Sequence, residues 1–210
     1  SFFFSHHIST IEGGMVLTNN PVFADGLRIL RAHGWARDVK DKERFATHMD
    51  PTIDPRFLHL APGYNFRPTE LAGAFGIHQL PRLAGFIKHR RRVAERLDDL
   101  LADRNYDQWV HRQESLTVAA PSYFAYGMTV SPDAPFTRAQ LTAYLEERGI
   151  ETRPIESGNV ARQPAMEQVH HRVQGALPNA NYLHDNGFFI GLHHGLDDSR
   201  VEYICETFDN

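Results

Sequence analysis

The chain has 210 residues, of which 41% are hydrophobic and 23% are charged, and its formal net charge is −4. This length suffices for one large or two small domains, and the composition excludes a disordered, collagen-like or coiled-coil protein. The charge does not fit a partner such as nucleic acid or an anionic membrane, and no apolar run approaches the roughly 18 residues of a membrane helix. The single cysteine, Cys205, excludes an internal disulfide and an all-cysteine metal or iron–sulfur site, and it fits a reduced cytoplasmic setting.

The first residues, 1–4 (SFFF), are typical of a buried strand and match neither a translation start nor a signal peptide. We therefore expect the chain to be a fragment, with part of the active site in a segment that precedes it. Residues 11–18 contain a Gly-Gly turn followed by an apolar run, which predicts a second strand.

A helix is predicted after Asn20, because asparagine is a good N-cap and Pro21 suits the first helical position. Gly34 predicts the end of this helix. Residues 36–62 contain three prolines and many charges, so they predict a long surface loop of the kind that often carries function.

Two consecutive helices are predicted next. Residues 69–80 predict a helix rich in small residues, and Pro81 predicts a break or kink after it. A long amphipathic helix then runs to about residue 103, with the basic run at 88–92 on its solvated face.

The pattern changes after the long helix. It predicts a strand, a helix opened by a capping box, a second strand and a last helix, at residues 122–130, 137–148, 150–155 and 199–208. These elements suggest a small α/β domain. We therefore place a domain boundary near residue 103, between residues 1–103 and residues 104–210.

The most informative segment is residues 1–14 (SFFFSHHISTIEGG). It resembles the coenzyme-lysine segment of the DegT/DnrJ/EryC1/StrS family of sugar aminotransferases, which use pyridoxal 5′-phosphate (PLP). In that family a Ser-Phe strand leads to the lysine, and Glu-Gly-Gly follows six residues later. Counting back six residues from Glu12 arrives at His6, so a histidine stands where the family has its lysine.

Further blocks agree with this resemblance, in the family's order and spacing: residues 31–35 (RAHGW), 62–68 (PGYNFRP) and 149–155 (GIETRPI). The resemblance implies an α/β fold of the fold-type-I PLP-dependent transferases, like that of aspartate aminotransferase. Residues 1–103 would form the end of the large PLP-binding domain, including the long linking helix. Residues 104–210 would form the small C-terminal domain.

The histidine changes the implied chemistry. A lysine amine forms a Schiff base with the coenzyme aldehyde, whereas an imidazole does not form that stable linkage. The cofactor, PLP or its amine form pyridoxamine 5′-phosphate, is therefore expected to be held noncovalently. Imidazoles exchange protons near neutral pH, so we expect His6 to be the catalytic proton carrier of an enzyme that starts like a transaminase without finishing like one.

This pattern is similar to a branch of the family whose members are lyases. They remove the C3 hydroxyl of a nucleotide-linked 4-keto-6-deoxy sugar, with glutamate as amino donor, and so make 3,6-dideoxy sugars for lipopolysaccharide O-antigen. A sister branch acts on CDP-sugars with an iron–sulfur cluster, but residues 34–44 lack the cysteines that such a cluster needs, which favours a GDP-sugar. Two alternatives stay open: an ordinary nucleotide-sugar aminotransferase, and a noncatalytic fragment or pseudoenzyme.

The resemblance also implies residues that bind the cofactor. Ser1 aligns with a serine that contacts the coenzyme, and Asn65 aligns with an asparagine that reaches the coenzyme phosphate of the neighbouring subunit. Arg67 is a candidate for a phosphate or substrate contact. The Asn65 assignment implies a homodimer with shared active sites. The alternatives are a serine at a strand end, a turn asparagine and an arginine that caps a turn.

Weaker candidates for substrate binding are His7, His33, Trp35 and Arg153. Neighbours in an extended strand point to opposite sides, so only one of His6 and His7 should face the coenzyme, and the spacing favours His6. His33 and Trp35 could instead serve packing. The chain's adjacent histidine pairs are poor chelators and no His-Glu-x-x-His pattern occurs, so no metal site is predicted.

Overall fold

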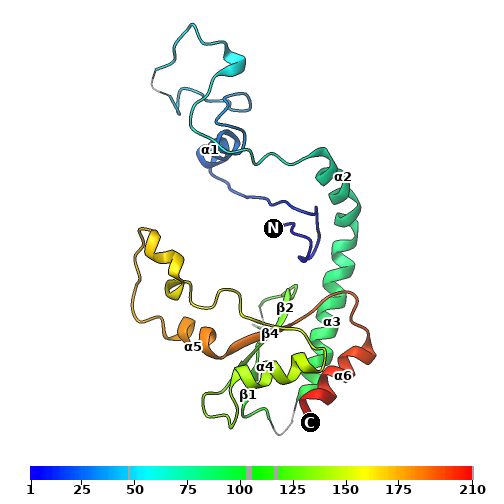
Figure 1. Ribbon diagram of the computed structural model, residues 1–210. Helices are drawn as coiled ribbons and strands as arrows, with labels where there is room; N and C mark the ends of the chain where they lie inside the picture. The colour runs from blue at the N-terminus through cyan, green and yellow to red at the C-terminus, as the bar shows by residue number, and fades with distance from the viewer. Residues whose placement is uncertain (47, 103–105, 116–117, 210) are drawn as a thin grey trace. The chain divides into compact units, whose positions relative to one another are not determined.

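The computed structural model describes residues 1–46, 48–102, 106–115 and 118–209. The chain divides into two compact units, Ser1–Pro81 and Arg82–Asn210. Figure 1 follows the chain through both units. The domain boundary that the sequence suggests near residue 103 stays a prediction for the complete protein. Among the described residues, no helix combines the length and the apolar character needed to cross a bilayer.

The first unit begins with a loop rather than with the predicted strands. The backbone N–H of Phe2 donates to the oxygen of Gly13 at 2.9 Å, and the oxygen of Phe2 accepts from the N–H of Thr10 at 2.9 Å. A strand needs a neighbouring strand for these groups, and here the segment satisfies them within itself. The predictions of strands at residues 2–4 and 11–18 are therefore wrong for the described structure.

Helix α1 (Pro21–Arg31) begins as predicted, because the Asn20 side chain accepts from the N–H of Val22 at 2.9 Å. The chain turns sharply after α1 at Gly34, whose φ is +83°. A Cβ atom there would lie 1.7 Å from the Ala61 oxygen, so only glycine fits this left-handed turn. The sequence correctly placed the end of the helix before Gly34.

The long loop after α1 is closed by two isolated β-bridges, Trp35↔His59 and Ala32↔Asn65. It contains one short 3₁₀ helix, η1 (Pro55–Phe57), which the Asp54 side chain caps. These bridges bring residues that are more than twenty positions apart in the sequence into contact, and they set the geometry of the site described below.

Helix α2 (Glu70–Gln79) has Thr69 as its N-cap, and the 3₁₀ turn η2 (Leu80–Arg82) follows it. This turn contains Pro81, which confirms the predicted interruption. Helix α3 (Leu83–Leu101) then opens the second unit. The prediction that its basic run at 88–92 is solvated is wrong for Arg90, which is 4% exposed because it donates to backbone oxygens of distant segments.

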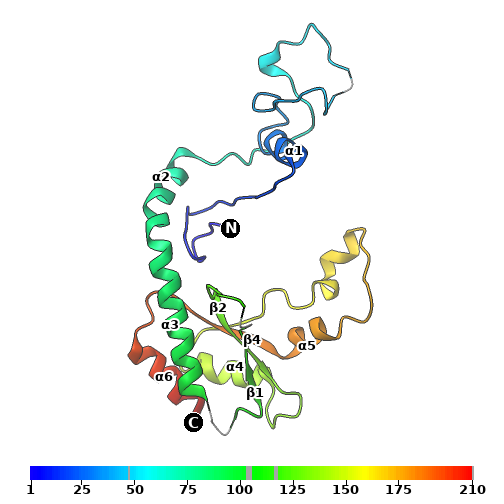
Figure 2. The same cartoon turned by 180° about the vertical axis from the view of Figure 1, so that it is seen from behind.

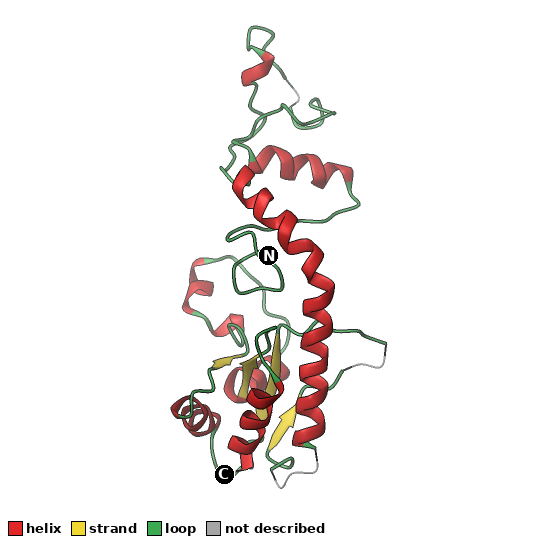
Figure 3. Cartoon of the chain, turned by 90° about the vertical axis from the view of Figure 1, so that its right-hand side faces the viewer, coloured by secondary structure: helices red, strands yellow, loops and turns green. Residues whose placement is uncertain are grey.

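The second unit is built around an antiparallel sheet with the strand order β1-β2-β4-β3. Its strands are β1 (Val110–Arg112), β2 (Ala125–Val130), β3 (Thr152–Pro154) and β4 (Gly187–Gly191). Figure 3 shows that the strands of the described chain belong to this unit. Sequence patterning predicted β2 and β3 but missed β1 and β4.

Three further helices complete the second unit: α4 (Arg138–Glu147), α5 (Pro178–Asn186) and α6 (Asp198–Asp209). Two short 3₁₀ helices, η3 (Val160–Arg162) and η4 (Pro164–Gln168), lie in the connection between β3 and α5. The capping box at Thr137 and Gln140 forms as predicted. Helices α3 and α6 pack against each other, as Figures 1 and 2 show from opposite sides.

The hydrophobic core lies between these helices and the sheet. Strand β2 alternates in burial, so that one face points inward. The core is contributed by α3, β2, β4 and α6, and its members include Val93, Leu97, Tyr126, Met128, Phe188, Ile190, Val201 and Ile204. Complete burial of such a side chain stabilises a fold by about 1.5–3 kcal/mol.

Candidate active site

His6 lies in the N-terminal loop of the first unit. Its backbone N–H donates to the oxygen of Phe3 at 3.0 Å, which closes a tight turn. The imidazole is half-buried and meets the Phe3 ring edge-on, with ring centroids 5.9 Å apart and an interplanar angle of 73°. The Ser1 hydroxyl accepts from the N–H of Phe3 at 3.2 Å, so both predicted residues are anchored by the same turn.

The same loop contains a strained residue. Ile11 has φ at +71°, a conformation that β-branched residues rarely adopt. Its N–H donates to the Ser9 hydroxyl at 2.8 Å, and the Thr10 hydroxyl donates to the oxygen of Glu12 at 2.8 Å. Strained backbone of this kind is often found at functional sites.

His7 is also half-buried in this loop. The expectation that His6 and His7 point to opposite sides assumed an extended strand, and the turn at these residues removes that argument. The choice of His6 over His7 therefore stays a prediction that depends on the spacing to Glu12.

A second group gathers around the side chain of Trp35. It contains the predicted residues His33, Trp35 and Arg67 together with Arg37 and His59, and we call it the indole cluster. The indole Nε1–H donates to Nε2 of His59 at 2.8 Å, and the indole ring lies 5.2 Å from the His33 ring. The guanidinium carbons of Arg37 and Arg67 lie 4.1 and 5.5 Å from the indole centroid. Both distances fit a cation–π contact.

Asn65 is joined to the indole cluster through Arg67, whose Nε donates to the Asn65 side-chain oxygen at 3.3 Å. The β-bridge to Ala32 fixes the backbone of Asn65. With its oxygen engaged in this way, the amide presents its nitrogen as a donor. An amide N–H, a guanidinium and a hydroxyl such as that of Ser1 are the donor types that suit a phosphate group.

Arg153 lies on β3 of the second unit. Its Nε and one terminal nitrogen donate to the Glu151 carboxylate at 3.0 and 2.8 Å, and both side chains are exposed. The structure thus pairs Arg153 with Glu151, the residue just before β3, and the predicted role of Arg153 in substrate binding stays untested.

The first unit therefore brings His33, Trp35, Asn65 and Arg67 together, and it places Ser1, His6 and His7 in one loop. Sequence reasoning missed Arg37 and His59, because their relation to Trp35 depends on a bridge across the long loop that no local pattern signals. Among the described residues, no group of three His, Cys, Asp or Glu side chains is arranged to hold a metal ion.

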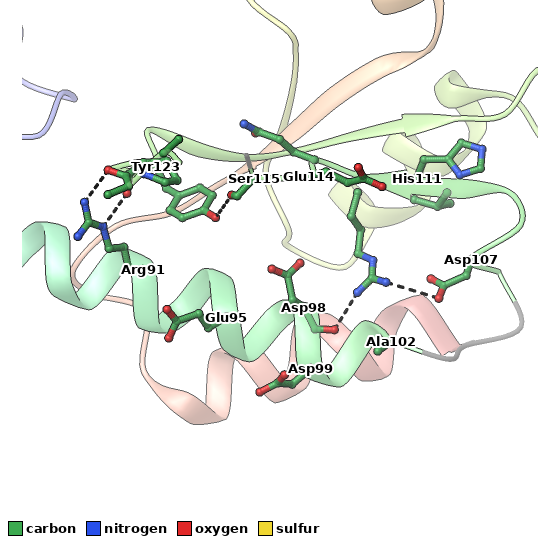
Figure 4. Close-up of a pocket in the computed structure, with 16 residues that line it drawn as sticks. Arg91, Glu95, Asp98, Asp99, Ala102, Asp107, His111, Glu114, Ser115 and Tyr123 are labelled. Atoms are coloured by element: carbon green, nitrogen blue, oxygen red, sulfur yellow. Dashed lines mark hydrogen bonds and ion pairs between the residues drawn. The ribbon is translucent and has the colours of Figure 1, made fainter. Parts of the chain in front are cut away.

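The second unit contains an open groove of about 990 Å³ between α3, β1 and the segment around residue 120 (Figure 4). Several of its polar side chains are engaged within the unit: Arg91 donates to the oxygens of Ala120 and Pro121, and Arg112 donates to the oxygen of Asp98. Burial and the adjacent Asp98 carboxylate raise the pKa of Tyr126 beside the groove. None of the predicted site residues lines it.

Comparison with known proteins places these residues in a family. The family model for DegT/DnrJ/EryC1/StrS aminotransferases matches residues 1–209. The chain belongs to this family. It is 35% identical over 210 residues to a GDP-4-keto-6-deoxy-D-mannose 3-dehydratase of Escherichia coli O55:H7, covering 99% of this chain and 53% of that protein. It is 34% identical over 216 residues to a dTDP-4-dehydro-2,6-dideoxy-D-glucose 3-dehydratase of Saccharopolyspora spinosa, covering 99% of this chain and 46% of the relative.

Crystal structures of GDP-4-keto-6-deoxymannose-3-dehydratase, ColD, have the same fold. One, with a trapped PLP-glutamate geminal diamine, has a TM-score of 0.84 and 33% identity, and the match covers 98% of this chain and 53% of that one. Another carries a histidine-to-lysine and a serine-to-asparagine replacement at consecutive positions; its TM-score is 0.85 at 34% identity, covering 99% of this chain and 54% of that one. The chain thus spans about half the length of the relatives it matches. These matches confirm the predicted α/β fold of fold-type-I PLP-dependent transferases.

Proposed function

We propose that the complete protein is a PLP-dependent nucleotide-sugar 3-dehydratase, which removes the C3 hydroxyl of a 4-keto-6-deoxy sugar. The observation that carries the proposal is the histidine at position 6, where the family's spacing calls for lysine. The 3-dehydratases that match 99% of this chain at 34–35% identity support it.

The ColD variant adds support for His6. It replaces a histidine and the serine immediately before it. This chain contains one Ser-His dipeptide, Ser5-His6, within the segment that resembles the coenzyme-lysine motif. The match to ColD covers nearly the whole chain, so Ser5-His6 is the natural counterpart of the replaced pair.

The residues of the chain fit a noncovalent cofactor. The bound coenzyme would supply an electron sink for bonds broken next to its ring. The imidazole of His6 forms no lasting bond to an aldehyde, so noncovalent contacts would hold the cofactor, and its phosphate offers one anchor. We assign this anchor to the Ser1 hydroxyl of one subunit and to the Asn65 amide nitrogen and Arg67 of the neighbouring subunit, where Arg67 and Asn65 are joined by a hydrogen bond.

His6 would act as the proton carrier. One ring nitrogen would take a proton from the methylene carbon of the amine-form cofactor, and the same imidazole would give it to the departing C3 oxygen as the carbon–oxygen bond breaks, so that the oxygen leaves as water. A histidine suits this double role because it exchanges protons near neutral pH. The turn that holds the backbone of His6 against Phe3 would fix the position of the imidazole.

The proposed substrate is a GDP-sugar, with glutamate as the amino donor. The chain's single cysteine cannot hold an iron–sulfur cluster, which argues against the cluster-dependent route to CDP-sugars. The indole cluster offers two guanidinium groups and an aromatic face to a sugar nucleotide. We also propose a cytoplasmic homodimer in which Asn65 serves the neighbouring subunit's cofactor, acting in O-antigen biosynthesis.

The test uses the complete protein with PLP, glutamate and a GDP-4-keto-6-deoxy sugar. We expect ammonia, 2-oxoglutarate and a sugar that has lost its 3-hydroxyl by mass. An amino sugar would instead show an aminotransferase, and absence of turnover would show a noncatalytic protein.

Two substitutions test the role of His6. His6→Asn should abolish dehydration, since an amide cannot carry the proton, and His6→Lys should give the yellow absorbance of a covalently held cofactor. His48→Asn, at an exposed histidine of the same unit, is the matched control and should keep activity. An active His6→Asn variant that is folded and binds PLP would contradict the assignment.

A further inference from the structure

The side chain of His59 connects two residues proposed to contact the sugar. Its Nε2 receives the indole Nε1–H of Trp35 at 2.8 Å, and its Nδ1 lies 3.0 Å from the backbone oxygen of His33. Neither the sequence motifs nor the proposed mechanism gives His59 a role. The ring of His59 therefore joins the two ends of the long loop. These contacts lie beside the backbone β-bridge between Trp35 and His59.

These two contacts define the protonation of the imidazole. An indole N–H can only donate and a backbone oxygen can only accept. His59 must therefore be neutral, with its proton on Nδ1 and its lone pair on Nε2. Protonation of Nε2 would place two N–H groups face to face and break the bond to Trp35.

The orientation of the indole matters because charged groups lie around it. Arg37 is 4.1 Å from the indole centroid, and its Nε donates to the backbone oxygen of Arg56 at 3.1 Å. Arg67 is 5.5 Å from the same centroid and also bonds Asn65. The His33 ring also lies near the indole, with ring centroids 5.2 Å apart.

We propose that His59 is a positioning residue: its neutral imidazole holds the indole of Trp35 in the one orientation that supports Arg37 and Arg67. Rotation of the indole would displace both guanidinium groups and, through Arg67, the amide of Asn65. His59 thus acts on substrate binding through Trp35 and Arg67 without touching the reacting atoms. Its link to substrate binding rests on the proposed function, whereas its contact with Trp35 does not.

The contact is tested on the chain itself by ¹H–¹⁵N NMR. The chain has two tryptophans, Trp35 and Trp109, so two indole N–H signals are expected, and Trp35→Phe assigns them. At pH 8 a long-range ¹H–¹⁵N spectrum should show His59 with its proton on Nδ1. The Trp35 indole nitrogen should also show a ¹⁵N–¹⁵N coupling across its hydrogen bond to Nε2 of His59.

Two variants separate His59 from its neighbours. His59→Gln offers an oxygen acceptor in place of the ring nitrogen, so the Trp35 N–H should stay hydrogen-bonded and lose its coupling to a ring nitrogen. His48→Gln, an exposed histidine of the same loop, is the control and should keep that coupling. A coupling that survives in His59→Gln, or a proton found on Nε2 in the parent, would overturn the proposal.

The link to substrate binding is tested on the complete protein. His59→Leu removes the acceptor, and we expect the KM for the nucleotide sugar to rise at least fivefold with kcat unchanged, whereas His59→Gln should stay within twofold of the parent. An unchanged KM in His59→Leu would overturn the link. If the parent protein shows no dehydratase activity, the proposed function fails, and the NMR result alone decides the role of His59.

Discussion

The two units of the chain are stabilised in different ways. The second unit buries large side chains completely, such as Leu97, Tyr126 and Phe188. The first unit buries few, mainly Ile29 and Val39, and leaves Leu71 82% and Ile77 71% exposed. The predicted site residues, apart from Arg153, lie in the first unit. The comparison shows that the candidate catalytic groups are positioned by local hydrogen bonds and ring contacts, while the hydrophobic core lies elsewhere.

Helix α2 illustrates this difference. Its own apolar residues are distributed around the whole helix, and Leu71, Phe75 and Ile77 are exposed in the described chain. Helix α3, in contrast, places its apolar residues on one face, where Val93, Ala94 and Leu97 are buried. A helix that is apolar on all sides is typical of a buried position in a larger fold. Substitutions of large apolar residues should therefore lower the free energy of unfolding more in the second unit, where such residues are buried, than in the first.

The largest effect is expected at Phe188 in the second unit. Phe188→Ala leaves a cavity at a fully buried position, which should lower the free energy of unfolding by about 3–5 kcal/mol. The control is Phe66→Ala in the first unit, a side chain that is 70% exposed and should change stability by less than about 0.5 kcal/mol. Urea unfolding measures both: Trp109 emission in a Trp35→Phe background follows the second unit, and Trp35 emission in a Trp109→Phe background follows the first. Similar losses in the free energy of unfolding from the two substitutions would contradict the proposed difference between the units.

Arg90 on α3 should give the next largest effect. It is 4% exposed, burial lowers its pKa, and one guanidinium nitrogen donates to the backbone oxygens of Tyr123, Phe124 and Leu192. Arg90→Met keeps most of the volume but leaves these oxygens without their donor, so we expect a loss of about 2 kcal/mol.

The matched control for Arg90 lies on the same helix. Arg92 pairs with Asp198 at 3.5 Å, and both side chains are exposed, so Arg92→Ala should cost less than about 1 kcal/mol. The same urea titration measures both variants. Equal losses would show that burial does not separate these two arginines.

Helix caps should behave alike in both units, because they act locally. Asn20→Ala removes the acceptor of the Val22 N–H in the first unit, and Thr137→Ala removes the acceptor of the Gln140 N–H in the second. Each should cost about 1 kcal/mol in the stability of its own helix. Amide hydrogen exchange measures this helix by helix. If Asn20→Ala also increased amide hydrogen exchange in the second unit, the prediction that each cap acts only on its own helix would be wrong.

The smallest effect is a pH dependence of the second unit. Partial burial and the positive charges of His194 and Arg90 lower the pKa of His193 below its usual value near 6.5. The unfolded state then binds the proton before the folded state does, so stability should fall as the pH drops below about 6.5. His193→Gln should flatten this part of the profile, and His111→Gln, an exposed histidine on β1, should not. Urea midpoints between pH 5 and 8 provide the measurement.

The site could be predicted from the sequence only in part. The resemblance of residues 1–14 to the family's coenzyme-lysine motif, with its spacing back from Glu12, implied His6 as the candidate catalytic residue. The same pattern suggested a strand at residues 2–4, which was wrong because strand formation depends on a neighbouring strand. Trp35 was recognised as a candidate, but its partner His59 lies 24 residues away, and no local signal links the two.

The sequence by itself determined the features that depend on neighbouring residues: the Asn20 and Thr137 caps, the interruption at Pro81, the glycine turn after α1 and the family motif around His6. Only the tertiary structure determined the pairing of β1 and β4 with β2, the closed loop at Phe2 and the contact between Trp35 and His59. The reason is physical. A cap or a proline acts through bonds within a few residues, whereas strand pairing and ring contacts depend on which distant segments meet.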